Sequence, residues 1–248
     1  MKQWPYENVF LHYKHDYHFV IYVVIILFMS YNSSCVKEEP AINLSVGVFG
    51  ASMCKGQTND SKQIWMKTMK QDGINLQITS CGINSMGFSS NLEKNVPWQI
   101  QNAKTFDIYI FWCGINDVRA GLIGEIGSAD LTTQSGGLLQ SVALIKERNE
   151  SAIILLFTSL PYFTDDGYLE TGALSQYVNA QKNFCEAYGI PYLDQFSQCG
   201  FNINNYKSYY EGTIHLKNEG YCFIAQIQAN FIRQILAKRM NENYLENN

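Results

Sequence analysis

The chain has 248 residues, of which 46% are hydrophobic and 16% are charged, and its formal net charge is −4. This length is sufficient for one domain with a substantial core once an N-terminal segment is set aside. The sequence has no basic stripe that could neutralise phosphates, so its composition argues against a nucleic-acid partner.

The N-terminal segment has the features of a signal peptide. An unbroken apolar run covers residues 19–29 and follows Lys14. The run is shorter than the roughly 20 residues needed to cross a bilayer, and it has the length of a signal-peptide apolar region. Ser33-Ser34-Cys35 follows, and small residues before a cysteine resemble the lipidation site of bacterial lipoproteins, although Asn32 stands where that pattern usually has an aliphatic residue.

We therefore expect residues 1–35 to be a signal peptide of lipoprotein type, with lipid attached to Cys35. An uncleaved membrane anchor is the alternative. Either arrangement predicts an extracytoplasmic protein that is tethered to the membrane or secreted. Residues 36–41 are expected to form a linker, residues 42–240 the domain, and residues 241–248 a polar tail that frays.

Apolar runs that alternate with helical patterns predict an α/β domain. Strands are expected at Ile42–Phe49, Leu76–Ser80, Phe106–Cys113, Ala152–Ser159 and Ile190–Asp194. Helices are expected at Ser61–Gln71, Gly137–Glu147, Leu174–Tyr188 and Glu219–Met240. The third and fourth strand segments are nearly continuous apolar runs, which is typical of parallel strands covered on both faces. The alternation therefore indicates a doubly wound parallel sheet.

The cysteines other than Cys35 are open to two interpretations. They are Cys54, Cys81, Cys113, Cys185, Cys199 and Cys222. Their even number permits disulfides in an oxidising compartment, whereas the absence of a CxxC pair gives a structural metal site little support. Because Cys54, Cys81 and Cys113 follow predicted strands, we favour their interpretation as small buried apolar residues.

Three polar or glycine residues follow successive predicted strands, namely Ser52, Gly82 and Asn116. Ligands bind at the carboxyl ends of strands in such sheets, so these residues are expected to converge. A serine hydroxyl needs a base, and His215 is the candidate because His12, His15 and His18 all lie in the N-terminal segment. The Asn116 side chain and the N–H groups of Ser52 and Gly82 could stabilise an oxyanion.

These residues occur in recognisable contexts. Ser52 lies in Val-Phe-Gly-Ala-Ser-Met, Gly82 in Thr-Ser-Cys-Gly-Ile-Asn, Asn116 in Gly-Ile-Asn-Asp, and His215 in Gly-Thr-Ile-His-Leu-Lys-Asn-Glu-Gly-Tyr. Over about residues 42–238 the chain resembles the SGNH hydrolase superfamily, also called GDSL esterases or lipases. The resemblance implies a flavodoxin-like three-layer sandwich around a mostly parallel five-stranded sheet. It also implies ester hydrolysis through an acyl-enzyme on Ser52, without a metal or other cofactor.

The acid of the expected triad departs from the family pattern, which places an aspartate three residues before the histidine. Gly212 occupies that position, and Glu211 precedes it. The longer side chain of Glu211 could compensate for the shifted spacing and orient the imidazole. Asp194, after the fifth strand, is a second candidate, although a strand-end cap is the simpler interpretation. A Ser-His dyad oriented by a backbone carbonyl is the third alternative.

A different serine-hydrolase fold is disfavoured, because Cys54 stands where the Gly-x-Ser-x-Gly elbow requires its second glycine. We therefore predict a carboxylic-ester hydrolase acting on a small-molecule or glycan ester. Aromatic residues in the segment Pro161–Gly172, which include Tyr162, Phe163 and Tyr168, favour the deacetylation of carbohydrate esters. The alternatives are an acyltransferase that uses the same site and an inactive carbohydrate-binding protein.

Overall fold

The computed structural model describes residues 41–89, 91–120, 122–164, 169–170 and 172–246. The predicted signal peptide, Cys35 and nearly all of the predicted linker lie outside the described residues. Within these described ranges, no helix combines the length and the apolar character needed to cross a membrane.

The centre of the domain is a five-stranded parallel sheet with the order β2-β1-β3-β4-β7. Its strands are β1 (Ile42–Gly50), β2 (Ile74–Ser80), β3 (Ile108–Trp112), β4 (Ile153–Phe157) and β7 (Tyr192–Leu193). The chain passes from β1 outward to β2 and then returns to place β3 on the other side of β1. The strand order therefore reverses beside β1, where doubly wound sheets bind their ligands. The predicted fold class is confirmed.

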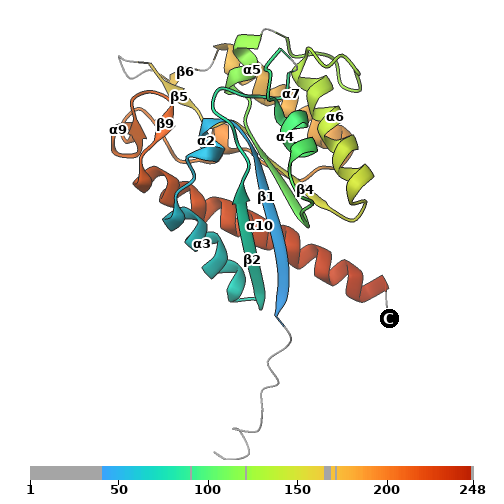
Figure 1. Cartoon of the computed structure of the whole chain (residues 1–248). Coiled ribbons are helices and arrows are strands. Elements are labelled where there is room, and N and C mark those ends of the chain that lie inside the picture. Colours follow the sequence, from blue (N-terminus) through green and yellow to red (C-terminus); the bar gives the residue numbers. More distant parts are fainter. Residues whose placement is uncertain (1–40, 90, 121, 165–168, 171, 247–248) are drawn as a thin grey trace, which may run out of the picture. The chain divides into compact units, whose positions relative to one another are not determined.

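Helices cover both faces of the sheet (Figure 1). One face packs against α3 (Asn59–Lys70) and α10 (Asn218–Glu246), and the other against α4 (Val96–Asn102), α6 (Gln134–Arg148) and α7 (Gly172–Tyr188). Successive β3 residues alternate between these two cores, so that Trp112 faces α10 whereas Phe111 faces the other helices. Because each face is buried, the strand is apolar throughout, as predicted.

Several short elements were not predicted. They are the helices α2 (Ser52–Lys55), α4, α5 (Ile115–Ala120), α8 (Gln195–Gln198) and α9 (Tyr206–Tyr209), and the strand pairs β5 (Tyr162–Phe163) with β6 (Leu169–Glu170) and β8 (Tyr210–Glu211) with β9 (His215–Leu216). These elements are too short to have a distinct hydrophobic period. Most of them surround the carboxyl ends of the strands (Figure 1).

Helix α10 continues to Glu246, beyond the predicted helix end at Met240 and into the segment that was predicted to be a polar tail. Adding a residue to an existing helix forms a backbone hydrogen bond and requires no packing. An ion pair of 3.8 Å between Lys238 and Glu242, one turn apart, further supports the exposed end of the helix.

All six cysteines of the described domain are free thiols. Cys54, Cys113, Cys185 and Cys199 are buried, whereas Cys81 and Cys222 are half-buried. The interpretation of Cys54 and Cys113 as buried residues is thus confirmed. In the part of the chain that the structure describes, no group of three or more His, Cys, Asp or Glu side chains could hold a metal ion.

Candidate active site

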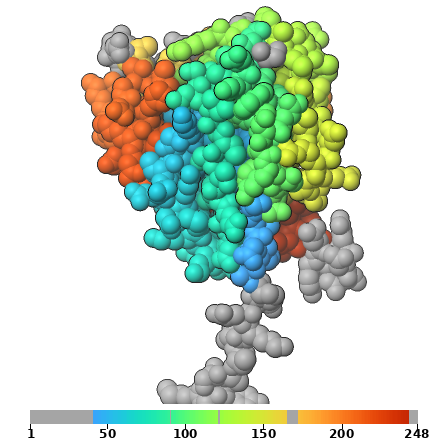
Figure 2. Space-filling model, viewed as in Figure 1, coloured from blue at the N-terminus to red at the C-terminus, as the bar shows by residue number. Residues whose placement is uncertain are grey.

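Ser52 and His215 meet although they are 163 residues apart in the sequence. Ser52 is the first residue of α2, separated from β1 by Ala51 alone, and His215 is the first residue of β9. The Ser52 Oγ and His215 Nε2 atoms are 3.0 Å apart, which is hydrogen-bond distance. Figure 2 shows the orange surface of the segment after residue 200 adjoining the blue surface of the segment after β1.

The backbone that leads into Ser52 is tightly constrained at Gly50. Gly50 has φ +149°, and a Cβ atom there would lie 2.2 Å from the Trp112 carbonyl oxygen, so only glycine fits. The buried Gln99 side chain accepts a hydrogen bond from the Gly50 N–H and donates one to the Gly50 carbonyl oxygen, both at 3.0 Å. Gln99 therefore fixes the peptide groups that place Ser52.

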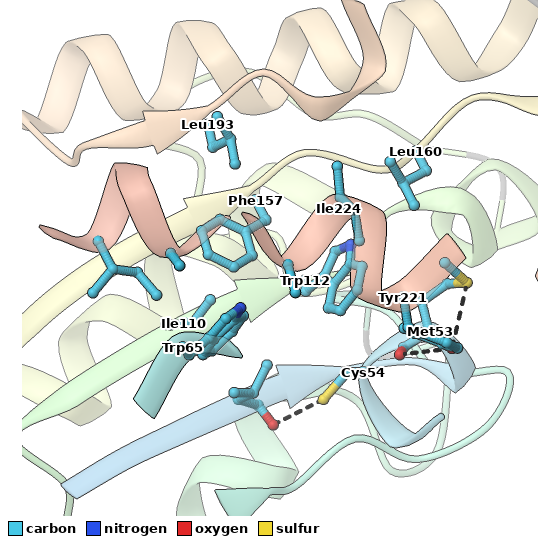
Figure 3. Packing of buried hydrophobic residues seen from close by; sticks show 14 of the residues in the cluster. Met53, Cys54, Trp65, Ile110, Trp112, Phe157, Leu160, Leu193, Tyr221 and Ile224 are labelled. Atoms are coloured by element: carbon cyan, nitrogen blue, oxygen red, sulfur yellow. Dashed lines mark hydrogen bonds between the residues drawn. The ribbon is translucent and has the colours of Figure 1, made fainter. Parts of the chain in front are cut away.

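Helix α2 is also held by residues of the core cluster that lies between the sheet and helices α3 and α10 (Figure 3). The Tyr221 hydroxyl on α10 donates to the Met53 carbonyl oxygen at 3.1 Å. The Cys54 thiol donates to the Val48 carbonyl oxygen at 2.9 Å, and burial raises the pKa of this thiol to about 12. Cys54 is therefore a neutral packing residue beside the serine and not a second nucleophile.

Gly82 lies in the loop after β2 and packs against the first turn of α2. A Cβ atom at this position would lie 2.6 Å from the Cys54 Sγ and 2.7 Å from the Ala51 carbonyl oxygen. The Gly82 N–H faces the Cys54 thiol, where it partly offsets the effect of burial on the thiol pKa. Within the described domain, the N–H groups of Ser52 and Gly82 donate to no backbone carbonyl.

Asn116 and Asp117, at the start of α5, hold the loop that follows Gly82. The Asn116 Nδ2 atom donates to the Met86 carbonyl oxygen at 3.0 Å, which uses one of its two hydrogens. The fully buried Asp117 accepts the N–H groups of Phe88 and Ser89 through Oδ1, both at 2.9 Å. Burial raises the pKa of the Asp117 carboxyl to about 7.

The contribution of Asp117 was missed from the sequence, where the Asn-Asp pair fits an ordinary turn. The sequence holds one trace of this contact, the glycine at position 87, where a Cβ atom would lie 2.3 Å from Asp117 Oδ2. The glycine can be interpreted in this way only once the two segments are known to be in contact.

The two candidate acids differ in their surroundings. Glu211 and His215 are directly opposite each other in the antiparallel β8–β9 pair, and both side chains are exposed. No hydrogen bond or ion pair joins Glu211 to His215 in the described structure. The Asp194 carboxylate pairs with Lys182 at 2.7 Å and caps α8 through the Ser197 N–H at 3.1 Å. Asp194 therefore has the contacts of a helix cap.

The segment after β4 supports the hairpin that carries His215. The Phe163 N–H donates to the Thr213 carbonyl oxygen at 3.0 Å, and the Tyr210 hydroxyl donates to the Pro161 carbonyl oxygen at 2.7 Å. The aromatic segment that begins at Pro161 thus contacts the histidine hairpin. Asp165, Asp166 and Tyr168 of that segment lie outside the described residues.

Two cavities of very different size adjoin Ser52 and His215. A groove of about 480 Å³ is lined by both residues and by mostly polar neighbours, namely Lys55, Gly56, Thr58, Asn84, Glu211, Leu216, Lys217, Asn218 and Tyr221. A pocket of about 20 Å³ is lined by the chain neighbours of Ser52 and His215 and mainly by apolar residues, namely Ala51, Met53, Trp112, Cys113, Ile115, Ser159, Leu160, Tyr162 and Ile214. This arrangement can hold an ester whose two arms differ in size and polarity.

Comparison with known proteins agrees with this geometry. The model of the GDSL-like lipase/acylhydrolase family matches residues 48–222, which is more than half of the chain. No curated protein matches the sequence significantly.

The fold is similar to that of several solved structures. A protein from Lactobacillus plantarum is 18% identical with a TM-score of 0.62, and the match covers 79% of this chain and 98% of that one. An acetyl xylan esterase from Geobacillus stearothermophilus is 13% identical with a TM-score of 0.54 (78% and 96% covered). A lipase/acylhydrolase from Enterococcus faecalis is 16% identical with a TM-score of 0.51 (79% and 96% covered).

Proposed function

Because the chain belongs to the GDSL-like lipase/acylhydrolase family and is thus an ester-bond hydrolase, we propose that Ser52 is its nucleophile and His215 its general base. The observation that carries this proposal is the 3.0 Å contact between Ser52 Oγ and His215 Nε2. A serine hydroxyl becomes an effective nucleophile when a neighbouring base takes its proton.

The reaction proceeds in two halves. Ser52 Oγ attacks the ester carbonyl carbon while its proton moves to His215 Nε2. The bond to the alkoxy oxygen then breaks, and His215 gives the proton to the leaving alcohol. Water then attacks the acyl-enzyme while its proton moves to His215, the bond between the acyl carbon and Ser52 Oγ breaks, and His215 returns the proton to Ser52 Oγ as the acid is released.

The oxyanion is stabilised by three donors in this proposal, namely the N–H groups of Ser52 and Gly82 and the second hydrogen of Asn116 Nδ2. The support is that the Ser52 N–H donates to no backbone carbonyl in the described part of the chain and that Asn116 uses only one of its two hydrogens, on the Met86 carbonyl. The Gly82 N–H, which faces the neutral Cys54 thiol in the free protein, would exchange this weak acceptor for the oxyanion. Donors held in fixed positions stabilise developing charge at little reorganisation cost, and each can contribute a hundredfold or more in rate.

Glu211 is the positioning residue for His215 in this proposal. Directly opposed residues in an antiparallel pair have Cβ atoms roughly 4.5–5.5 Å apart and project from the same face. The Glu211 carboxylate can therefore reach the His215 ring by rotation of its own side chain, without movement of the hairpin. Its contact would fix the ring orientation and stabilise the imidazolium.

The substrate class that fits the groove is an ester of a hydrophilic alcohol, and we assign it to carbohydrate esters. Lys55, Thr58, Asn84 and Asn218 offer donors and acceptors to sugar hydroxyls along the groove. The fold similarity to an acetyl xylan esterase supports the same assignment. We further propose that the enzyme acts outside the cytoplasm, tethered through lipid on Cys35.

The test is to treat the purified full chain with a fluorophosphonate probe and to map the adduct by mass spectrometry. We expect labelling at Ser52, loss of labelling in Ser52→Ala, and a strong decrease in His215→Ala, with the same circular dichroism spectrum for all three proteins. Ser151, an exposed serine, provides the matched control variant Ser151→Ala. A folded wild-type protein that is not labelled would contradict the proposal.

A further inference from the structure

The small pocket is built from the immediate neighbours of the proposed catalytic residues. Ala51 and Met53 flank Ser52 in the chain, and Ile214 and Ile115 directly precede His215 and Asn116. All four residues line the pocket, whereas Ser52 and His215 themselves line the groove. The small pocket therefore adjoins the backbone on either side of Ser52, whereas the Ser52 side chain belongs to the groove.

The chemistry of ester cleavage decides which arm of the substrate enters which cavity. The proton that His215 takes from Ser52 must later reach the oxygen of the leaving alcohol, so this oxygen lies on the side of His215 Nε2. The groove is the cavity that His215 lines, and the alcohol therefore extends into it. The acyl arm lies on the other side of the carbonyl carbon and therefore enters the small pocket.

The small volume of the pocket favours a short acyl arm. The pocket measures about 20 Å³, against about 480 Å³ for the groove. Its inner wall includes Trp112 and Leu160, which are 1% and 6% exposed and belong to the core cluster seen in Figure 3. Such close-packed residues cannot move aside for a longer chain without strain.

The outer rim of the pocket is less constrained. Ile115 and Ile214 are half-buried and belong to neither of the two core clusters. Their side chains close the rim from the α5 side and from the histidine hairpin, respectively. Shortening them would lengthen the pocket while the core wall stays in place.

We propose that this pocket binds the acyl group and makes the enzyme prefer short acyl esters such as acetates, and that Ile115 and Ile214 set the limit on chain length. The inference rests on the proposed function of Ser52 and His215. It adds two specificity-determining residues and assigns the acyl arm and the alcohol arm to separate cavities.

The test measures kcat/KM of the full chain, purified in detergent, for p-nitrophenyl acetate, butyrate and hexanoate, with Ser52→Ala as the background. We expect the wild-type kcat/KM to fall about tenfold or more from acetate to butyrate, because a few methylenes in a closed apolar pocket have effects of this size. In Ile115→Ala/Ile214→Ala the butyrate-to-acetate ratio should rise about tenfold, and Ile115→Val should shift it less in the same direction.

Ile203→Ala is the matched control, because Ile203 is 49% exposed and lines neither cavity, and its ratio should equal that of the wild type. A Ser52-dependent activity that is equal on all three esters would overturn this inference and leave the proposed function intact. An unchanged ratio in the folded double variant would overturn it as well. A folded wild-type protein with no Ser52-dependent activity on any ester would overturn both.

Discussion

The Gln99 side chain binds both the N–H and the carbonyl oxygen of Gly50, which lies two residues before the proposed nucleophile Ser52. Its Oε1 atom accepts the Gly50 N–H and its Nε2 atom donates to the Gly50 carbonyl, each at 3.0 Å. Gln99 is 3% exposed and sits in the short helix α4, and its Nε2 atom donates also to the Lys94 carbonyl. The turn into Ser52 is therefore positioned by a side chain whose hydrogen bonds go to the Gly50 and Lys94 backbone.

We expect Gln99→Glu to slow catalysis more than it weakens substrate binding. A carboxylate retains the acceptor for the Gly50 N–H but places a second oxygen against the Gly50 carbonyl, and a buried group left without its partner costs about 1–3 kcal/mol. The measurement is kcat and KM for p-nitrophenyl acetate together with urea unfolding. Gln101→Glu, at an exposed position of the same helix, should match the wild type. An unchanged kcat in a folded Gln99→Glu protein would mean that these hydrogen bonds do not position Ser52.

Glu211→Gln tests the proposed positioning of His215. The amide has the size of the carboxylate but no charge with which to stabilise the imidazolium, so we expect kcat to fall by about tenfold or more while KM stays close to the wild-type value. Glu211→Asp should restore part of the loss, and Glu219→Gln, another exposed glutamate, should have no effect. If Glu211→Gln retains full kcat, the site works as a Ser-His dyad.

The sequence predicted the sheet and the candidate site because both depend on local patterns. Apolar runs at 106–113 and 152–159 reflect strands buried on two faces, and the residues after such strands necessarily meet at one edge of a parallel sheet. That rule was sufficient to bring Ser52 and Asn116 to the same end of the domain.

The supporting contacts were beyond prediction because they join segments that are distant in the sequence. Helix α4 is too short for a clear amphipathic period, so Gln99 appeared as an ordinary polar residue. Asp117 looked like part of a turn until its contacts with Phe88 and Ser89 were known. At the end of α10 the difficulty was local. A polar composition suggested a frayed tail, because polar composition does not show that an existing helix extends readily into solvent.

Cys35→Ser tests the proposed lipid anchor. With the cysteine in place, we expect the chain expressed in a bacterial host to incorporate labelled palmitate and to sediment with membranes. The variant should lose the label, while Cys222→Ser should keep it, because Cys222 belongs to the folded domain. An unlabelled wild-type chain that stays in the membrane with its N-terminus intact would instead favour the uncleaved anchor.

Asp117 makes the stability of the domain depend on pH. Burial raises the pKa of its carboxyl from an ordinary value of 3.8 to about 7 in the folded protein. Between these two pH values the folded state holds a proton that the unfolded state has lost, so the free energy of unfolding falls as the pH rises. At 1.36 kcal/mol per pH unit, and with the slope decreasing as the pH approaches the folded-state pKa, the loss between pH 5 and pH 7 is about 2 kcal/mol.

Asp117→Asn should remove this contribution, since an asparagine does not titrate and its side-chain oxygen can still accept the N–H groups of Phe88 and Ser89. Urea unfolding at pH 5 and pH 8 should therefore show a smaller decrease for the variant than for the wild type. Asp72→Asn is the control, because Arg233 lowers the pKa of Asp72 and its titration lies below this window. Equal decreases in the wild type and Asp117→Asn would show that the carboxyl is already ionised at pH 5 and that the loop from Met86 to Ser89 is held by a charged group.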